Sequence, residues 1–232
     1  MKYNKISIII PVYNEETTIN KIVKRVMDAD CLGLNKEIII VDDGSTDNTP
    51  NILANIKSKK IIKITNKRNY GKGYSLRRGF KIATGDIILI QDADLEYNPK
   101  DYAKIIRPFL NHDSLVVYGS RELSGKNKHS SVFFHAGGRT ITTCTNLLYR
   151  SHLTDVPTGY KAFQSDLLNS LQLKCTRFEF CPEVTAKILS RGINIIEVPI
   201  KYDARHKKDG KKIKWVDGIE ALWTLIKIKC NL

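Results

Sequence analysis

Two carboxylates separated by one residue, Asp92 and Asp94, directly follow an apolar run at residues 86–90. A third acid, Glu96, continues the same spacing. Carboxylates this close repel one another unless a cation neutralises them, and their oxygens suit Mg²⁺ or Mn²⁺, which keep positions open for substrate phosphates. The alternative is a solvated turn, because a D-x-D sequence often arises by chance.

A second acidic cluster, Asp42 and Asp43, ends another apolar run and is followed by Gly44 and Ser45. Either it is a tight turn before a capped helix, or one of its carboxylates accepts a hydrogen bond from a nucleotide base. The sequence leaves both interpretations open.

Two further segments carry side chains suited to a nucleotide. Tyr13 and Glu15 follow the first apolar run, where the tyrosine ring either stacks on a base or lies at the rim of the fold. Lys72 stands between two glycines at the start of an expected helix, a place where a phosphate can approach, although the Walker A pattern is absent.

These side chains need a scaffold, and the first half of the chain alternates β-branched runs with segments of helical apolar spacing. The expected strands are residues 6–12, 37–41, 60–64, 86–90 and 114–119, and the expected helices are 17–27, 49–56, 72–83 and 99–110. The alternation predicts an α/β fold with a mostly parallel, doubly wound, Rossmann-like sheet and helices on both faces. Ligands of such sheets bind at the carboxyl ends of the strands, where the acidic clusters occur.

The alternation is looser after residue 120. We expect a polar loop at 125–131, helices at 135–149, 182–190 and 214–229, and strands at 160–163 and 193–202. Because no linker rich in proline, glycine or serine interrupts the chain, we expect one domain over residues 1–232, with a C-terminal extension over the sheet.

The chain carries 38 Lys and Arg residues against 24 Asp and Glu residues, a formal net charge of +14. This charge predicts an anionic partner: nucleic acid, a phosphorylated small molecule or an anionic membrane surface. The basic stretch at 201–214 is typical of a solvated loop. In the last helix Trp215, Ile219, Leu222 and Ile226 share one face, which favours core packing over a role at a membrane surface.

The composition is that of a globular protein, with 42% hydrophobic and 27% charged residues. No apolar run approaches the roughly 20 residues that a spanning helix needs, and the N-terminus turns polar too early for a signal peptide. The five cysteines lack metal-ligand spacing and are typical of reduced thiols. We therefore expect a cytoplasmic protein that is not secreted.

The motifs follow one another in the order PVYNEE, VDDGSTD, NYGKGYS, QDADLEYNP, GSRE, LTDVPTGYKAF, EFCPE, EVPIKYDAR and GKKIKWVDG. This series, from residue 6 to residue 223, resembles the family 2 glycosyltransferases of the GT-A fold. More narrowly, it is similar to polyprenyl-phosphate hexosyltransferases of the dolichol-phosphate mannose synthase type. The resemblance implies a GDP-mannose, UDP-glucose or UDP-N-acetylglucosamine donor and a dolichyl or undecaprenyl phosphate acceptor. Residues 1–120 would form the donor half and 121–232 the acceptor half.

The resemblance also implies roles for individual residues. The expected nucleotide-sugar contacts are Pro11, Tyr13, Glu15, Val41, Asp43, Lys72, Asp92, Ala93, Asp94 and Lys211. The expected ligands of Mg²⁺ or Mn²⁺ are Asp92, Asp94 and Glu96, and the expected acceptor-phosphate residues are Arg121, Arg139, Arg205 and Lys211. Asp92, Asp94 and Arg205 would be the catalytic residues.

This sequence departs from the family pattern in three places. Glu96 stands where the mannose synthases have glutamine, Arg139 lies in HAGGRTIT where an HxxGN-type stretch is usual, and Cys181 changes G-F-E-P-E to EFCPE, which ends at Glu183.

The chemistry fits these residues. A phosphate monoester has a second pKa near 6, so at neutral pH it is already an anionic nucleophile and needs no dedicated base. A divalent ion and a ring of Arg and Lys would neutralise the charge of donor and acceptor. We predict a single displacement that inverts the anomeric configuration, with Asp155 either orienting the acceptor or capping a helix.

Alternatives are a glycosyltransferase of this fold with a non-lipid acceptor, and a nucleotidyltransferase, for which residues 11–17 lack the glycine-rich loop. A nucleic-acid partner is not expected, because the acids converge at strand ends and the basic residues are not interleaved with aromatic ones. We expect peripheral association with an anionic membrane at its cytoplasmic face. The oligomeric state is left open.

Overall fold

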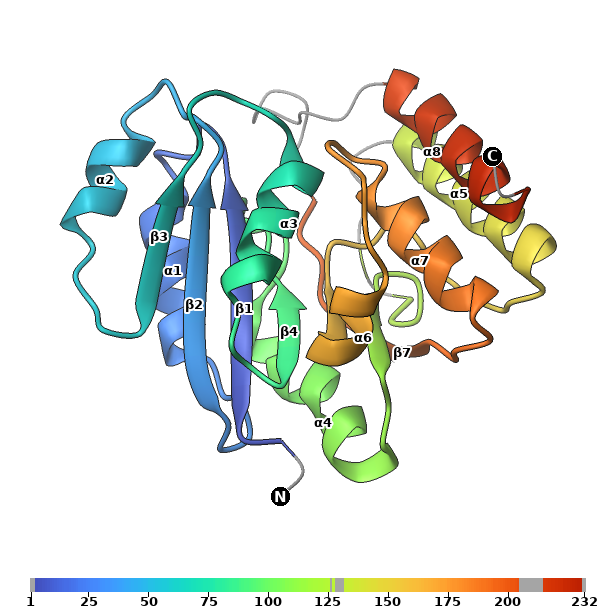
Figure 1. Cartoon of the computed structure of the whole chain (residues 1–232), viewed down its shortest axis with the longest axis horizontal. Coiled ribbons are helices and arrows are strands. Elements are labelled where there is room, and N and C mark those ends of the chain that lie inside the picture. The colour runs from blue at the N-terminus through green and yellow to red at the C-terminus, as the bar shows by residue number, and fades with distance from the viewer. Residues whose placement is uncertain (1–2, 126, 128–131, 205–214, 231–232) are drawn as a thin grey trace.

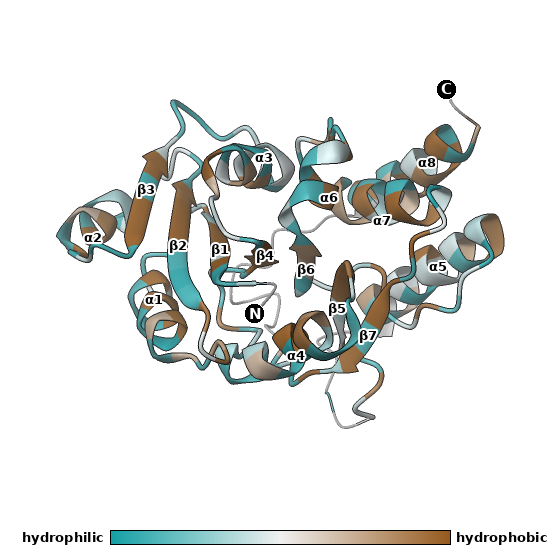
Figure 2. Ribbon diagram, turned by 60° about the horizontal axis from the view of Figure 1, so that its bottom comes forward, coloured by the Kyte–Doolittle hydropathy of each residue, from teal (hydrophilic) through white to brown (hydrophobic). Residues whose placement is uncertain are grey.

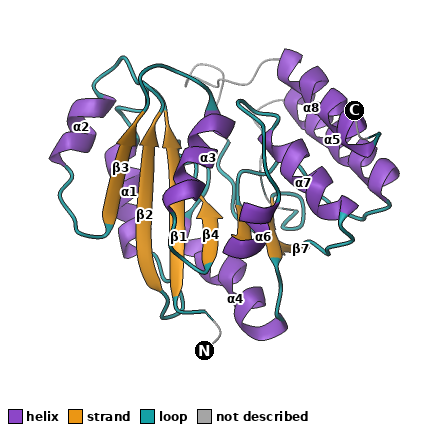
Figure 3. Cartoon of the chain, in the orientation of Figure 1, coloured by secondary structure: helices purple, strands orange, loops and turns teal. Residues whose placement is uncertain are grey.

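A seven-stranded sheet forms the centre of the computed structural model, which describes residues 3–125, 127, 132–204 and 215–230 (Figures 1 and 3). Its strand order is β3-β2-β1-β4-β6-β5-β7. The strands are β1 (Lys5–Val12), β2 (Asn35–Asp42), β3 (Ile61–Thr65), β4 (Ile87–Ile90), β5 (Val116–Ser120), β6 (Lys161–Gln164) and β7 (Ile196–Pro199).

The sheet is mostly parallel, as predicted. β1 pairs in parallel with β2 and β4, β2 with β3, and β5 with β7, while β6 runs antiparallel between β4 and β5. The chain builds β2 and β3 on one side of β1 and then crosses to place β4 on its other side. This reversal is a topological switch point, and ligands of α/β sheets bind outside the strand ends at such a point.

Helices cover both faces of the sheet (Figure 1). The helices are α1 (Ile19–Asp28), α2 (Thr49–Asn55), α3 (Lys72–Ile82), α4 (Tyr102–His112), α5 (Val132–Tyr149), α6 (Ser165–Ser170), α7 (Phe180–Ser190) and α8 (Trp215–Lys229), with a 3-10 turn η1 (Pro99–Asp101). Because successive strand residues point to opposite faces, Ile8 joins the core beneath α1 and α4, whereas Ile9 joins the core beneath α3 and α7. The predicted α/β architecture is confirmed.

The second half of the chain differs in detail from the prediction. α6 was not expected. Of the strand expected at 193–202, only Ile196–Pro199 forms a strand of the sheet, and Tyr202 makes an isolated bridge to Tyr97. Strands from both halves complete one sheet, because β6 inserts between β4 and β5. The second half therefore extends the sheet as well as lying over it.

The buried face of α8 is not the one that the spacing favoured. Ala221 and Leu225 are buried, whereas Ile219 and Ile226 are exposed, so the prediction that these isoleucines pack into the core was wrong. α8 packs on α5 and α7 (Figure 1). The side chain of Trp215 lies outside the described residues.

A polar clamp closes the end of the sheet opposite to the acidic strand ends. Glu37 on β2 is buried and accepts hydrogen bonds from Lys5 Nζ at 2.7 Å, Ser7 Oγ at 2.5 Å and the Thr84 backbone N–H at 3.0 Å. Burial raises the pKa of Glu37, but hydrogen bonds from Lys5, Ser7 and Thr84 outweigh it and lower the pKa to about 2. The carboxylate thus joins β1, β2 and the turn before β4.

We predict that Glu37→Gln lowers the free energy of unfolding at neutral pH. In the variant, that free energy should also depend less on pH between pH 2 and pH 5. A folded-state pKa of about 2, below the ordinary value of 4.5, contributes stability that is fully present above pH 4.5 and is lost as the pH falls through 2. The lowering of the pKa from 4.5 to about 2 corresponds to a contribution on the order of 3 kcal/mol to the free energy of unfolding. Urea denaturation between pH 2 and pH 7 measures it, and an identical pH dependence in wild type and variant would contradict the clamp.

Candidate active site

A cleft of about 540 Å³ opens at the carboxyl ends of the strands. Sequence-predicted residues that line it are Pro11, Tyr13, Glu15, Asp43, Lys72, Asp92, Ala93, Asp94, Glu96, Arg121 and Arg139. Val41 does not line the cleft, because its side chain is buried in the core beneath α3. Arg205 and Lys211 lie outside the described residues. The structure therefore brings eleven of the predicted side chains together at one place.

The acidic segment after β4 is paired with a lysine from another element. Lys72 Nζ, at the start of α3, lies 2.5 Å from Asp92 Oδ1. Burial lowers the pKa of Lys72, but the Asp92 carboxylate outweighs it and raises that pKa above its ordinary value. The Glu96 backbone N–H donates to Asp94 Oδ1 at 3.2 Å, and Leu95 between them has a positive φ of 65°. The segment is thus a sharp turn that presents its acids to the cleft.

The geometry is consistent with a divalent metal bound jointly with a substrate. Among the described residues, no three Asp, Glu, His or Cys side chains are grouped closely enough to hold a metal by themselves. Mg²⁺ typically binds through one or two carboxylates plus substrate phosphates and waters. The oxygens of Asp92 and Asp94, both in the cleft, form such a donor set.

Because Gly159 has no side chain, the Asp92 carboxylate can pack directly against its backbone. A Cβ atom on Gly159 would overlap Asp92 Oδ2 and come within 2.8 Å of the Tyr97 ring. The Gly159 backbone N–H donates to Tyr97 Oη at 2.8 Å. The chain entering β6 therefore packs directly against the acidic segment.

Asp43 orders the loop that leads into α3. Its carboxylate accepts hydrogen bonds from Asn66 Nδ2 at 2.6 Å, from the Tyr70 N–H at 3.1 Å and from the Gly71 N–H at 2.7 Å. Gly71 has a φ of 104°, and a Cβ atom there would overlap the Thr176 carbonyl oxygen. Asp43 thus has a structural role, and its place on the cleft wall still lets it face a ligand.

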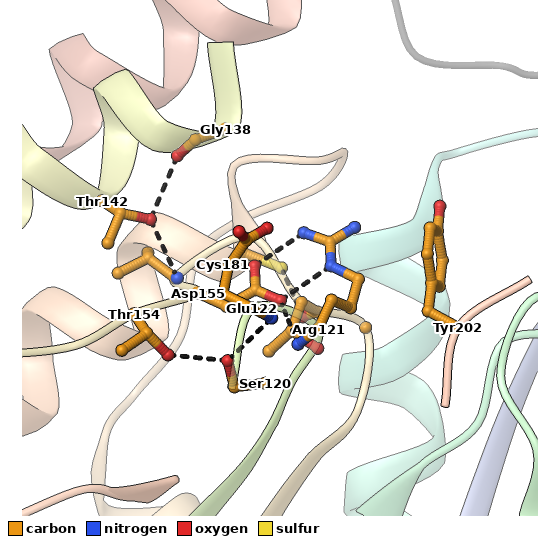
Figure 4. Close-up of polar contacts among 12 residues, drawn as sticks. Ser120, Arg121, Glu122, Gly138, Thr142, Thr154, Asp155, Cys181 and Tyr202 are labelled. Carbon is orange, nitrogen blue, oxygen red and sulfur yellow. Dashed lines mark hydrogen bonds and ion pairs between the residues drawn. The ribbon is translucent and has the colours of Figure 1, made fainter. Parts of the chain in front are cut away.

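Arg121 and Asp155 form a buried bidentate ion pair (Figure 4). Arg121 Nε and Nη2 each donate to the Asp155 carboxylate at 2.7 Å, and the Arg121 backbone N–H donates to it at 2.9 Å. Burial raises the pKa of Asp155, but Arg121 outweighs it and lowers that pKa. Asp155 caps no helix, so the helix-cap role, one of the two considered for it, is excluded. It holds the guanidinium at the cleft wall instead.

Arg139 lies on α5, where its Nη1 is 3.9 Å from Glu122 Oε2. His135 Nε2, one turn earlier, lies 3.2 Å from the same oxygen. The Arg139 side chain is about two-thirds exposed, so it is free to reorient toward an arriving anion.

Glu183 proves to be structural. It is buried in the first turn of α7 and accepts hydrogen bonds from the backbone N–H groups of Lys174 and Cys175 and from Lys187 Nζ. These contacts hold the 174–179 loop against α3, because the Gly73 N–H donates to the Arg177 carbonyl oxygen. The EFCPE motif thus shapes one wall of the cleft.

The far side of the cleft is largely apolar, which the sequence did not indicate. Its apolar lining residues are Phe134, Gly137, Gly138 and Ile141 of α5, Phe178 before α7, Phe180 and Pro182 of α7, and Gly218 and Ala221 of α8. The same helices also contribute His135, Arg139, Thr142 and Asp217. A Cβ atom would meet nothing within 4 Å at Gly137 or Gly218. Glycines inside helices were the available signal, because glycine lowers helix stability and a helical glycine therefore often has a packing or functional reason.

Among the polar residues of the cleft wall that the sequence did not predict are Arg177, Tyr97 and Tyr202. Arg177 precedes α7, and its Cγ would lie 3.1 Å from a Cβ atom on Gly71. Tyr97 and Tyr202 form an isolated antiparallel bridge. Only the tertiary structure places these residues at the site.

The chain is similar in sequence to a known protein family and to characterised enzymes. Residues 7–171 match the family described as Glycosyl transferase family 2. The chain is 34% identical to the UDP-N-acetylglucosamine–dolichyl-phosphate N-acetylglucosaminyltransferase of Methanococcus voltae, over 97% of this chain and 96% of that protein. It is 29% identical to the dolichol-phosphate mannosyltransferase of Pyrococcus furiosus, over 89% of this chain but only 59% of that protein.

The fold also matches solved structures. Glucosyl-3-phosphoglycerate synthase from Mycobacterium tuberculosis, solved with Mn²⁺, UDP and glucosyl-3-phosphoglycerate, has a TM-score of 0.71 and 19% identity, covering 99% of this chain and 81% of that one. At this identity the likeness concerns the fold, which is GT-A. With the family match over most of the chain, it follows that this protein belongs to glycosyl transferase family 2 and is a glycosyltransferase.

Proposed function

We propose that this glycosyltransferase moves a hexose from a nucleoside diphosphate sugar to a polyprenyl phosphate, with Mg²⁺ or Mn²⁺ and with inversion at the anomeric carbon. The observation that carries the proposal is the two-sided cleft. Acids and cations line it at the strand ends, and α5, α7 and α8 present mainly apolar residues on the other side, beside the polar His135, Arg139 and Asp217. A phosphate attached to an isoprenoid chain matches both walls, whereas a purely polar acceptor would leave the apolar wall without a partner.

The donor would lie at the strand ends of the first half. Tyr13, Glu15 and Asp43 line the side suited to the nucleoside, and Lys72, Asp92 and Asp94 line the side suited to its diphosphate. A divalent ion held by Asp92 and Asp94, with Glu96 beside them, would neutralise the departing diphosphate. Lys72 would exchange its contact with Asp92 for the donor phosphates.

The acceptor phosphate would lie at Arg121 and Arg139. One of its oxygens forms a bond to the anomeric carbon while the bond from that carbon to the donor diphosphate breaks, and the nucleoside diphosphate leaves with the electron pair. The phosphate is largely a dianion at pH 7, so no side chain has to remove a proton. Asp155 keeps the Arg121 guanidinium facing the cleft.

The acceptor is a membrane lipid, so we also propose peripheral binding to an anionic, cytoplasmic membrane face. None of the described helices is long and apolar enough to cross a bilayer. Hydrophobic and hydrophilic residues alternate along α8 (Figure 2). Its exposed apolar stripe consists of Val216, Ile219, Trp223 and Ile226, and Lys227 and Lys229 near its end are exposed as well. A helix of this kind binds at the interface of an anionic bilayer. Another face of α8 lines the cleft through Gly218 and Ala221, so membrane and acceptor site would adjoin.

We predict that Asp94→Ala lowers kcat/KM for sugar transfer by about 100-fold or more, because a metal-binding carboxylate at the reacting centre is lost. EDTA should abolish transfer by the wild type, and Mn²⁺ or Mg²⁺ should restore it. The control is Asp166→Ala, an exposed acid on α6 outside this cleft, which should keep full activity. Undiminished transfer by Asp94→Ala would contradict the donor site.

The apolar wall gives a prediction about the acceptor. Gly218→Leu should raise the KM for a long polyprenyl phosphate by about ten-fold and leave the donor KM within about two-fold, because it fills space beside the phosphate site. Leucine favours helix more than glycine does, so α8 should remain folded. The matched control is Thr224→Leu, on α8 but outside the cleft. If the two variants behave alike, the lipid tail does not lie along this wall.

Membrane binding can be measured separately. The double variant Ile219→Ser/Trp223→Ser should lose most flotation with liposomes that contain anionic lipid, because two exposed apolar side chains of the stripe are removed. Met27→Ser/Ile62→Ser removes two exposed apolar side chains from α1 and β3 and should float like the wild type. Equal flotation of both double variants would count against α8 as the membrane-binding element.

A further inference from the structure

Tyr202 contacts both halves of the cleft wall. Its hydroxyl donates to Glu96 Oε2 at 3.0 Å, on the acidic segment. The Arg121 guanidinium lies over its ring, with Cζ 5.0 Å from the ring centroid (Figure 4). One side chain thus touches a carboxylate of the proposed metal loop and the arginine of the proposed acceptor-phosphate site.

The backbone around Tyr202 fixes its place independently of the side chain. Tyr202 pairs with Tyr97 in an antiparallel bridge, and the Asp203 N–H donates to the Glu96 carbonyl oxygen at 2.9 Å. The Tyr202 N–H donates to Asn127 Oδ1 at 2.9 Å. These contacts remain when the side chain changes, so a substitution at Tyr202 tests its ring and hydroxyl and not the path of the chain.

The Tyr202 ring packs at one end of a column of tyrosine rings. The Tyr97 ring lies 5.3 Å from the Tyr202 ring and stacks on Tyr160 at 4.7 Å. The hydroxyls of Tyr160 and Tyr102 donate to Gln91 Oε1, at the end of β4. The column is anchored in the sheet, and Tyr202 at its top is only half-buried and faces the cleft.

On its other side Arg121 is held by Asp155, so its guanidinium lies between a carboxylate and an aromatic ring. A cation over an aromatic face is attracted by the ring quadrupole and keeps its charge for a further ligand. The Tyr202 ring therefore limits the directions in which this arginine can point.

We propose that Tyr202 is a positioning residue that sets the distance between the metal-binding loop and the acceptor-phosphate arginine, through its hydroxyl on Glu96 and its ring on Arg121. This inference rests on the proposed function. Two parts of one side chain have different roles: the hydroxyl positions Glu96 on the donor side, and the ring positions Arg121 on the acceptor side.

The two parts are separated by two substitutions. Tyr202→Phe removes the hydroxyl and keeps the ring, so we expect Mn²⁺ affinity in the presence of UDP or GDP to fall about five-fold with the acceptor KM unchanged. Tyr202→Leu removes both, so we expect the same loss of Mn²⁺ affinity and a rise in acceptor KM of about three-fold. Mn²⁺ binding is followed by electron paramagnetic resonance and needs no turnover. Acceptor KM is measured with a polyprenyl phosphate.

The matched control is Tyr118→Phe, which removes a buried hydroxyl bonded to Thr185 Oγ1 outside the cleft. It should leave both constants unchanged. A double-mutant cycle adds specificity: in a Glu96→Gln background, Tyr202→Phe should change Mn²⁺ affinity less than it does in the wild type, because the charged partner is gone.

Unchanged Mn²⁺ affinity in Tyr202→Phe, or an acceptor KM equal in the Phe and Leu variants, would overturn the inference. If the wild type binds Mn²⁺ and nucleotide but does not glycosylate polyprenyl phosphate, the proposed acceptor is wrong, and the Mn²⁺ titration still decides whether the hydroxyl positions Glu96.

Discussion

The cleft depends on opposite charges that meet across distant parts of the chain. Lys72 pairs with Asp92 at 2.5 Å, and Arg121 pairs with Asp155 at 2.7 Å. Buried pairs of this kind add little net stability, since desolvation offsets their attraction, but the loss of one partner is costly because a charge is left buried and alone. Their role here is geometric, because they fix the positions of acidic and basic side chains that line the cleft.

The antiparallel strand β6 makes this arrangement possible. Its insertion between β4 and β5 brings Gly159 and Tyr160 beside the acidic segment and places Asp155 next to Arg121 at the end of β5. A purely parallel continuation of the sheet would send the chain back behind it through a crossover. The reversal therefore joins the acidic side of the cleft to the side that holds Arg121 within one sheet.

The charged and apolar linings of the cleft also narrow the choice of partner that the net charge left open. A net charge of +14 fits nucleic acid, membrane or phosphorylated metabolites equally well. The described structure places Lys72 and Arg121 at the strand ends of a cleft whose other side is mainly apolar, and α8 turns Gly218 toward that cleft and an apolar stripe toward solvent. This pattern favours a ligand that is a phosphate at one end and a hydrocarbon at the other.

The sequence by itself predicted the α/β fold, the strand-end acids and the family, because strand and helix periodicity and short motifs are local properties of the chain. It did not predict which face of α8 is buried, the role of Asp155, the apolar wall or the place of Tyr202. Arg121 and Asp155 lie 34 residues apart, and Glu96 and Tyr202 lie 106 apart. Contacts over such separations depend on the order and direction of the strands, which only the folded sheet decides.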